Sequence, residues 1–413
     1  MNYKKSLYLS AFALASLLLS CGGSKKKDIV ISDDITVIEI PGPDKSIIAE
    51  DILDPATVEM VALETTPESL ITTISKMYYL EERYYVLDGN LTMVMMFDKG
   101  GKYLGKIHNL GKGPREYIQI SYFDVDPVAR KVLLADGFSG KIFVLDRDLN
   151  IEKIVKPAVR PSNIPAYRDG KFLQGQPYPH LRNMSDAAYK RSDAIVMDSS
   201  GTIIKSLIPA ECDDENSFYP SDMAIAYEKD GTILMIPGFS NIIYETSSDL
   251  ESVEPKYYLD FKMKDYKLID YSNYNKLVKD KQQATFILSD LFDEGYVFTG
   301  NSIYNTDNHL FVEYGKNRLY CAYDKVNKKS KTFFMGFYKG LTAPSGDVAM
   351  FAVANNISGA SGDRMFFNMP VWLWKIQVPA DHSTLLQEVS DSIHKMDENA
   401  NPVILSFKIK EFK

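Results

Sequence analysis

The sequence has few of the residues that usually carry metal or thiol chemistry. Of its 413 residues, three are cysteine and five are histidine. The histidines show no HExxH or paired-ligand spacing, so we expect no zinc site. After Cys21, the two remaining cysteines, Cys212 and Cys321, are too few for a disulfide framework. A bridge between these two is open, and an unpaired, apolar Cys321 is the simpler expectation.

Other absences exclude whole classes of function. The sequence contains no Gly-x-Ser-x-Gly or HExxH motif, so no motif argues for an enzyme and catalytic residues stay unassigned. The net charge is −8 and the basic residues form no stripe, which argues against nucleic acid as a partner. The acidic run Asp213 to Glu215 lacks the glycine-punctuated spacing of a calcium loop and predicts a solvated turn. We therefore expect neither a metal nor a cofactor.

One long apolar run is present, at the N-terminus. Lys4 and Lys5 precede the apolar segment Leu7 to Leu19, which has signal-peptide length and is too short to span a bilayer. The run ends in LLSCG at residues 18–22, which resembles a bacterial lipobox. We expect a signal peptide over residues 1–20 and a membrane anchor through lipid on Cys21; an ordinary secretory signal is the alternative. The small, polar residues 21–35 predict a flexible tether, and residues 36–413 a single domain.

An internal repeat organises the rest of the chain. The segment DGFSGKIF at residues 136–143 recurs as PGFSNIIY at residues 237–244, an offset of 101 residues, and DGNL at residues 88–91 lies near half that offset. Turn residues recur at Asp98, Asp146, Asp198 and Thr246, at intervals of 48, 52 and 48 residues. A unit of this length suits a four-stranded propeller blade. In the first unit, β-branched and aromatic residues predict strands over residues 74–79, 84–88, 93–97 and 103–107.

The later part of the chain departs from this rhythm. The next matching turn, at Asp324, follows Thr246 by 78 residues. The amphipathic pattern near residues 265–295 predicts a helical insert, and residues 383–396 predict a short C-terminal helix. A sixth unit is assembled from residues 348–376 and a last strand over residues 402–410. Residues 58–63 would pair beside that strand and close the ring. The sequence therefore predicts an all-β, six-bladed β-propeller with four-stranded blades.

Two segments resemble a known family. GKGPREY at residues 111–117, followed by FDVD at residues 123–126, is similar to a motif of the six-bladed β-propeller lipoproteins of Bacteroides and its relatives. NPVILSFKIK at residues 401–410 resembles that family's C-terminal signature. The resemblance implies the fold and a cell-envelope location, whereas the family's function is largely unknown. Arg115 stands where the family pattern usually has glycine. The basic run Lys25 to Lys27 favours the periplasmic side of the outer membrane over the cell surface.

Loops that join one blade to the next are the expected place for function. In the loop of residues 108–120, Arg115, Glu116 and Tyr117 could face a ligand at the channel mouth and be more exposed than Phe123 and Val125. Alternatively, Tyr117 packs beneath the loop and Arg115 pairs with Glu116. The further ligand-binding candidates are Tyr178, His180, Arg182, Phe218 and Tyr219.

Two functions remain open at this stage. The first is a non-catalytic module that binds a glycan, a peptide or a partner protein, which the missing catalytic motifs favour. The second is a lyase or hydrolase acting on polysaccharide or peptide at the channel mouth. Its acid, base and charge-stabilising groups would be Arg115, Glu116, Tyr117 and His180.

Overall fold

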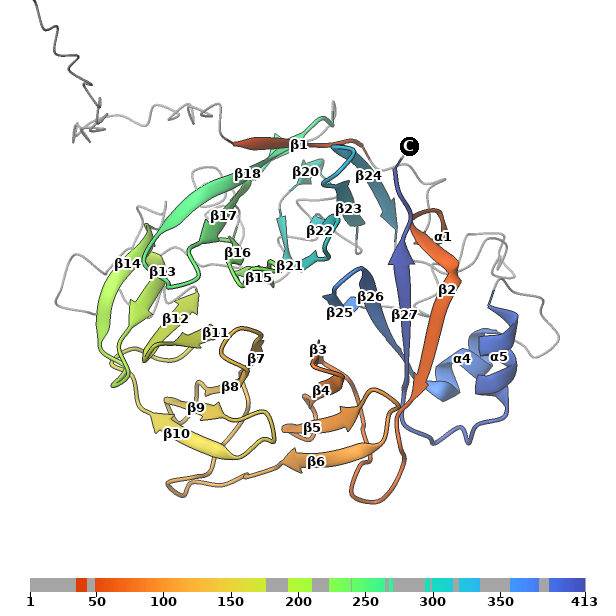
Figure 1. Cartoon of the computed structure of the whole chain (residues 1–413), viewed down its shortest axis with the longest axis horizontal. Helices are drawn as coiled ribbons and strands as arrows, with labels where there is room; N and C mark the ends of the chain where they lie inside the picture. The colour runs from red at the N-terminus through yellow and green to blue at the C-terminus, as the bar shows by residue number, and fades with distance from the viewer. Residues whose placement is uncertain are drawn as a thin grey trace, which may run out of the picture.

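The structure, a computed structural model, describes eleven segments of the chain: residues 35–42, 49–175, 192–209, 223–238, 240–263, 267–269, 294–297, 299–314, 319–334, 357–378 and 386–412. These residues form six small sheets arranged in a ring around a central axis (Figure 1). The predicted all-β, six-bladed β-propeller is confirmed.

In each blade the strands run from an innermost strand at the axis to an outermost strand at the rim. Blade 1 contains β3 (Lys76–Leu80), β4 (Arg83–Asp88), β5 (Met93–Asp98) and β6 (Tyr103–Ile107). Blade 2 contains β7 (Tyr122–Asp126), β8 (Lys131–Asp136), β9 (Lys141–Leu145) and β10 (Ile151–Val155). Blade 3 contains β11 (Asn163–Arg168), β12 (Lys171–Gly175), β13 (Ser192–Met197) and β14 (Ile203–Pro209). The four strands predicted for the first unit are confirmed.

The second half of the ring repeats this order. Blade 4 contains β15 (Ala224–Tyr227), β16 (Ile233–Ile236), β17 (Ile242–Thr246) and β18 (Val253–Phe261). Blade 5 contains β21 (Thr299–Asn305), β22 (His309–Tyr314), β23 (Leu319–Asp324) and β24 (Lys329–Phe334). Blade 6 contains β25 (Ile357–Ser361), β26 (Arg364–Met369), β27 (Val403–Ile409) and β2 (Leu53–Ala62).

The regularly spaced turn residues of the sequence lie between the third and fourth strands of their blades. In blade 1, Asp98 Oδ1 accepts hydrogen bonds from the amides of Gly100 and Lys102, both at 2.9 Å. Asp146 and Asp198 make the same pair of bonds in blades 2 and 3. An aspartate at the start of a turn thus binds its own backbone two and four residues on, which explains why it recurs.

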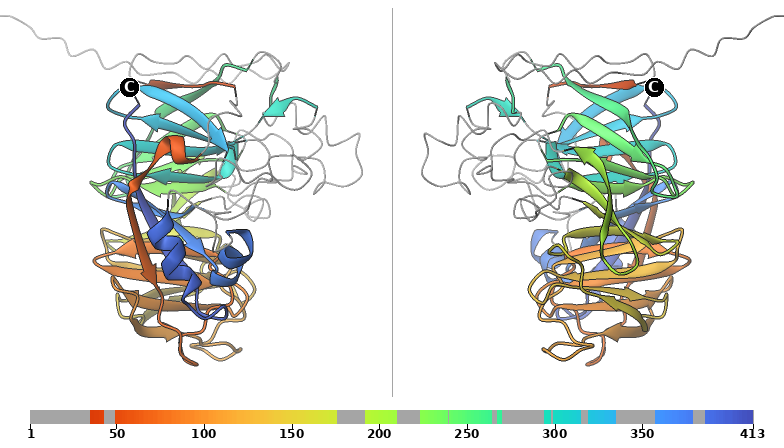
Figure 2. Two further views of the ribbon diagram at one scale, coloured as in Figure 1. Left: turned by 90° about the vertical axis from the view of Figure 1, so that its right-hand side faces the viewer. Right: turned by 90° about the vertical axis from the view of Figure 1, so that its left-hand side faces the viewer.

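Two helices lie outside blade 6, between β26 and β27 (Figures 1 and 2). One of them, α5 (Gln387–His394), confirms the predicted C-terminal helix. The other, α4 (Val371–Gln377), corrects the expectation that the sixth blade extends to residue 376. Val371 and Trp374, three residues apart, are both fully buried, so a helix lets this segment place both side chains in the blade 6 core.

Three short elements complete the described chain. β19 (Lys267–Leu268) and β20 (Tyr296–Val297) form a small parallel pair at the ends of the predicted helical insert, of which residues 270–293 lie outside the described ones. α1 (Ala49–Ile52) precedes β2. Among the described helices, none combines the length and the apolar character needed to cross a membrane.

The ring is closed by strands from the two ends of the chain. β2 pairs antiparallel with β27, with Met60 opposite Leu405 and Val61 opposite Ile404. The predicted pairing of residues 58–63 with the last strand is confirmed. A second N-terminal strand, β1 (Thr36–Ile40), adds to blade 4 parallel to β18, which the sequence did not predict. The outer edge of blade 4 is therefore covered as well.

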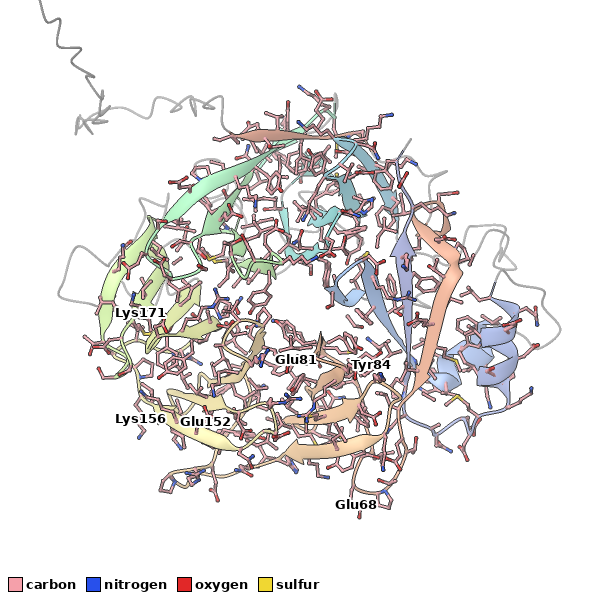
Figure 3. The ribbon with its side chains drawn as sticks, in the orientation of Figure 1. Glu68, Glu81, Tyr84, Glu152, Lys156 and Lys171 are labelled. Carbon is pink, nitrogen blue, oxygen red and sulfur yellow. The ribbon has the colours of Figure 1, made fainter. Side chains whose placement is uncertain are left out.

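The core lies between the blades rather than at the centre of the ring. The buried apolar residues that the structure describes form six clusters, one at each interface between neighbouring blades. Between blades 1 and 6, the ring centroids of Tyr84 and Phe366 are 6.2 Å apart in an edge-on contact (Figure 3). Between blades 1 and 2, those of Tyr78 and Phe123 are 5.4 Å apart. Each blade is thus stabilised by its two neighbours.

The buried side-chain amide of Asn401 connects the closing strand to the segment that leads into blade 1. Asn401, just before β27, is 1% exposed. Its Oδ1 accepts a hydrogen bond from the amide of Ile71 at 2.8 Å. Its Nδ2 donates to the carbonyls of Glu64 at 2.8 Å and Ser69 at 2.7 Å. All three partners lie on the connection from β2 to β3, so Asn401 links the two ends of the ring.

The loop of residues 108–120 joins blade 1 to blade 2 and is held by its own contacts. Glu116 Oε2 accepts a hydrogen bond from the amide of Gly113 at 2.7 Å. Gly111 has a φ of +155°, which residues with a side chain rarely adopt, and a Cβ there would lie 1.9 Å from the same oxygen, so glycine is favoured at this position. Lys141 Nζ donates to the carbonyls of Gly113 at 2.8 Å and Glu116 at 2.7 Å.

Tyr117 lies beneath this loop. Its side chain is 0% exposed, against 1% for Phe123, so the expectation that Tyr117 is exposed at the channel mouth is wrong. The alternative, that it packs beneath the loop, is confirmed. Its hydroxyl lies 3.1 Å from the carbonyl of Thr92 and 3.2 Å from that of Ile107, and burial raises the pKa of Tyr117 to about 12. Arg115 is exposed and donates to the carbonyl of Ile151.

We expect Asn401→Ala to lower the free energy of unfolding by about 2–4 kcal/mol, because it leaves the buried amide of Ile71 and the buried carbonyl of Ser69 without their partner. Urea denaturation would measure the change. Asn399, which is exposed and lies shortly before Asn401 in the chain, provides the matched control. Asn399→Ala should keep the free energy of unfolding within about 0.5 kcal/mol of wild type. Equal effects of the two changes would contradict the role of Asn401 as a link.

Tyr117→Ala should lower the free energy of unfolding by about 3–5 kcal/mol, the cost of truncating a buried aromatic side chain. Arg115→Ala, two residues away and exposed, should change it by less than about 0.5 kcal/mol. Thermal or urea unfolding of the two variants would measure both changes in the free energy of unfolding. A negligible loss for Tyr117→Ala would show that the loop does not depend on this ring.

Candidate functional site

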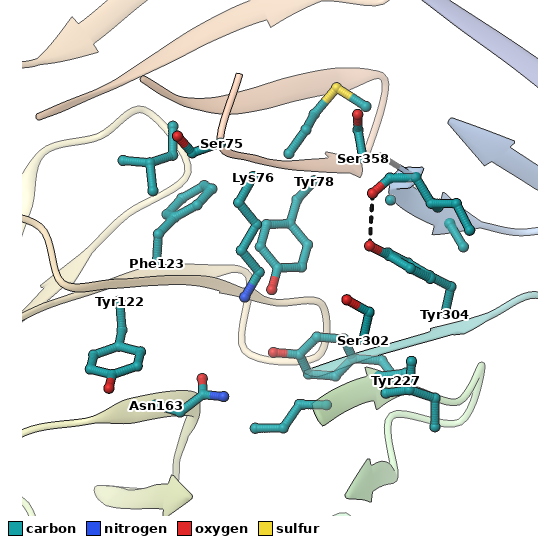
Figure 4. A pocket seen from close by; sticks show the side chains of 18 of the residues that line it. Ser75, Lys76, Tyr78, Tyr122, Phe123, Asn163, Tyr227, Ser302, Tyr304 and Ser358 are labelled. Carbon is teal, nitrogen blue, oxygen red and sulfur yellow. Dashed lines mark hydrogen bonds between the residues drawn. The ribbon is translucent and has the colours of Figure 1, made fainter. Parts of the chain in front are cut away.

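A cavity of about 410 Å³ lies on the axis of the ring (Figure 4). We call it the axial cavity. The innermost strands of all six blades, β3, β7, β11, β15, β21 and β25, contribute to its wall. Because these strands lie far apart in the sequence, the cavity exists only once the ring has closed.

Hydroxyl and amide groups dominate the polar part of this wall. The polar lining residues are Ser75, Lys76, Tyr78, Ser121, Tyr122, Asn163, Tyr227, Ser302, Tyr304, Asn305 and Ser358. Of the described residues that line the cavity, none is Asp, Glu, His, Cys or Arg. The wall therefore offers hydrogen-bond donors and acceptors, aromatic faces and one ammonium group.

The ammonium group of Lys76 is fixed by a carboxylate that lies behind the wall. Asp124, which is 1% exposed, accepts hydrogen bonds from Lys76 Nζ at 3.0 Å and from the Tyr78 hydroxyl. Burial, together with the charge of Asp124, raises the pKa of Tyr78 well above its usual value. Burial also raises the pKa of Asp124, and Lys76 and Tyr78 oppose that shift. Tyr78 therefore keeps its proton at neutral pH.

Two asparagine side chains of the wall each present an unused acceptor. Asn163 Nδ2 donates to the carbonyl of Met223 at 3.1 Å, and Asn305 Nδ2 to that of Tyr227 at 2.9 Å. The Oδ1 atoms of both asparagines are buried and have no hydrogen-bond partner among the described residues. Because a buried acceptor without a partner is costly, these oxygens are suited to accept hydrogen bonds from a bound molecule.

The aromatic rings of the wall are held in place by their hydroxyl groups. Tyr304 donates to the carbonyl of Ile357 at 2.7 Å (Figure 4). Tyr227 donates to that of Pro165 at 2.8 Å. Each bond joins the innermost strands of two neighbouring blades. The faces of these rings are thus in fixed positions before any ligand binds.

The residues that the sequence nominated are not those that line the cavity. Arg115, Glu116 and Tyr117 lie near blades 1 and 2 but outside the wall. Arg115 contacts β10, Glu116 contacts the loop itself and Lys141 of β9, and Tyr117 contacts blades 1 and 2. Arg115 and Glu116 as ligand contacts stay a prediction. Cys321 is a free cysteine, and burial raises its pKa to about 12. Within the described part of the chain, no three His, Cys, Asp or Glu residues gather as a metal site would need.

Several predicted residues lie outside the described ones, so their predictions stand as made. They are the anchor Cys21, the cysteine Cys212, the acidic run from Asp213 to Glu215, and the ligand candidates Tyr178, His180, Arg182, Phe218 and Tyr219.

The sequence did carry a signal for the axial cavity. The innermost strands of blades 1 and 2 begin with polar or hydroxylated residues, as in Lys76, Tyr78, Tyr122 and Asp124, where a buried strand would be apolar. This pattern indicates strands that border a polar space. It could not show that six such strands border the same one.

Comparisons with known proteins agree with the fold. A search of curated proteins finds no match. Among solved structures, a protein of Bacteroides fragilis NCTC 9343 described as exported is 19% identical, with a TM-score of 0.71, covering 91% of this chain and 100% of its own. A DUF4221 family member from Bacteroides vulgatus ATCC 8482 is 11% identical, with a TM-score of 0.49, covering 86% of this chain and 99% of its own.

A family model supplies the assignment. The model, described as a domain of unknown function and named DUF4934, matches residues 35–408. This match includes all six blades, and the predicted family resemblance is confirmed. The protein, a six-bladed β-propeller, belongs to the DUF4934 family.

Proposed function

We propose that this protein is an exported, lipid-anchored binding protein whose axial cavity holds part of a glycan without converting it. The observation that carries the proposal is the composition of the described cavity wall: four tyrosines, four serines, two asparagines and one lysine as its polar groups. Rings stack on the apolar faces of sugars, and hydroxyl and amide groups pair with sugar hydroxyls.

The size and rigidity of the cavity fit such a ligand. Its volume of about 410 Å³ falls within the range of roughly 300–1,000 Å³ that is typical of small-molecule sites. Tyr78, Tyr227 and Tyr304 are fixed by hydrogen bonds to protein groups. Binding then costs little ordering of side chains. A partner protein would need a wide surface, whereas this cavity admits a sugar unit or a single side chain.

The chemistry of the wall favours binding over catalysis. Glycoside hydrolysis generally uses a pair of carboxyl groups that flank the bond to be cleaved, and no carboxyl group is among the described lining residues. A lyase needs a base, and the raised pKa of Tyr78 keeps its hydroxyl protonated at neutral pH. Turnover of a bound glycan is therefore the outcome that would favour the alternative of a lyase or hydrolase.

The proposed location rests on the N-terminal sequence. The lipobox-like LLSCG at residues 18–22 supports lipid on Cys21, and the first described strand, β1, begins at Thr36, which leaves a tether between anchor and propeller. The similar protein of Bacteroides fragilis that is described as exported is consistent with this placement. We propose the periplasmic side of the outer membrane, because the tether is basic where an acidic run would favour the surface.

Ser302→Phe should weaken glycan binding by about tenfold or more, because the added ring occupies the space where a sugar would lie. Glycan arrays, followed by calorimetry on any glycan that binds, would measure this with protein lacking residues 1–21. Analysis of the recovered glycan should find it unchanged. Ala360→Phe, from a different blade of the same wall, should have the same effect.

Ser199→Phe is the matched control for both cavity variants. Like the cavity variants, it introduces a phenylalanine, here in the exposed turn after β13. This turn lies beside the end of β11 that is farther from Asn163. Thermal unfolding would establish that all three variants fold. Unchanged binding by folded Ser302→Phe and Ala360→Phe would refute the axial cavity as the site.

Cys21→Ala should release the protein from the membrane, because its acyl chains provide the anchor. Detergent phase partitioning and fractionation of cells would show wild type with the membrane and the variant in the soluble fraction. Ser24→Ala in the tether is the control and should behave like wild type. A variant that still partitions into detergent and stays with the membrane would overturn the anchor.

A further inference from the structure

A second cavity opens beside the axial one, between blades 2 and 3. Its volume is about 420 Å³, and we call it the lateral cavity. Its polar lining residues are Gln119, Ser121, Tyr122 and Arg160. Gln119 to Tyr122 lead into β7, and Arg160 belongs to the connection from β10 to β11, so both sides of the cavity are entrances to innermost strands.

The two cavities share part of their walls. Ser121 and Tyr122 line both of them. Tyr122 therefore borders two spaces of similar volume, each within the range typical of small-molecule sites. A ligand with consecutive units could place one unit on each side of this ring.

Arg160 supplies the lateral cavity with a positive charge, and none of the described residues that line this cavity is acidic. Its guanidinium carbon lies 5.6 Å from the ring centroid of Phe138, which is itself 63% exposed. A Cβ on Gly137 would lie 3.2 Å from Arg160 Nε, so the glycine leaves room for the guanidinium. Arg160 is exposed, and the ring of Phe138 lies beside its guanidinium at the edge of the cavity.

We propose that the lateral cavity is a subsite for a carboxylated sugar next to the unit held in the axial cavity. Arg160 would donate paired hydrogen bonds to the carboxylate, the geometry for which guanidinium is suited. Ser121 and Gln119 would meet the hydroxyls of the same sugar, and Tyr122 would contact both units. This inference rests on the proposed glycan binding and specifies the ligand as a uronate-containing oligosaccharide.

Matched pairs of oligosaccharides test the inference. The probes are oligogalacturonates, alginate oligomers and hyaluronan oligomers, each beside its carboxyl-reduced counterpart, with binding measured by calorimetry. Wild type should bind the acidic member of a pair about tenfold or more tightly than the neutral one, because only its carboxylate can accept charge-assisted hydrogen bonds from the guanidinium. This preference should shrink at high salt concentration.

Variants of Arg160 separate the subsite from general electrostatics. Arg160→Gln should remove the preference for the acidic member while leaving binding of the neutral member within about twofold, since its charge is lost but the axial cavity is intact. Arg160→Lys should restore the preference only in part, because an ammonium cannot make the paired contact. Arg130→Gln is the control: it removes an exposed arginine, which pairs with Glu81, from the turn between β7 and β8, at the opposite end of β7 from Tyr122.

Each result bears on a different statement. Equal binding of acidic and neutral members by wild type, or a preference that survives Arg160→Gln, would overturn the lateral subsite and leave glycan binding standing. Failure to bind any glycan, with Arg160-dependent binding of acidic peptides instead, would overturn both. Loss of the acidic preference in Arg160→Gln but not in Arg130→Gln is the supporting result.

Discussion

The pairing of β2 with β27 is the contact on which the rest of the molecule depends. Each blade packs only against its neighbours, as the six interfacial clusters show, so an open ring would leave two apolar blade faces exposed to water. The pairing of Met60 with Leu405 and of Val61 with Ile404 joins the N-terminal strand to the last strand, so neither blade face is left exposed. Asn401 adds hydrogen bonds between the closing strand and the entrance to blade 1. Closure also places the six innermost strands around one axis, and so it creates the axial cavity.

The segment that most resembles a functional motif serves as a structural joint. In GKGPREY, the glycines accommodate the carboxylate of Glu116, Lys141 binds two carbonyls, and Tyr117 fills the space between two blades. A loop that must turn sharply and also seal an interface needs glycine, proline and a large ring. Those residue types are also common in binding loops, so their presence cannot distinguish the two roles.

The candidate site has the opposite character: its residues are ordinary members of regular strands. Lys76 and Tyr78 belong to β3, and the buried Asp124 of β7 holds both of them. The tyrosines bind backbone carbonyls and present fixed rings, while Asn163 and Asn305 keep acceptors available. Such a rigid, mostly uncharged wall suits the proposed recognition of a ligand by the arrangement of its hydroxyls. The positive charge of Arg160 lies in the neighbouring lateral cavity.

The sequence by itself determined the blades and their closure. Strand alternation, aspartates such as Asp98 that bind their own turn, and a repeat near 50 residues are local or periodic features, as is the stripe that gives α5. The apolar run around Val371 and Trp374 did not reveal its helix, because short apolar runs fit strand and helix alike. Tertiary structure decided the burial of Tyr117, which depends on a neighbouring blade through Phe143. It also decided the site, because residues as distant as Lys76 and Tyr304 become neighbours only when β2 meets β27 and the ring closes.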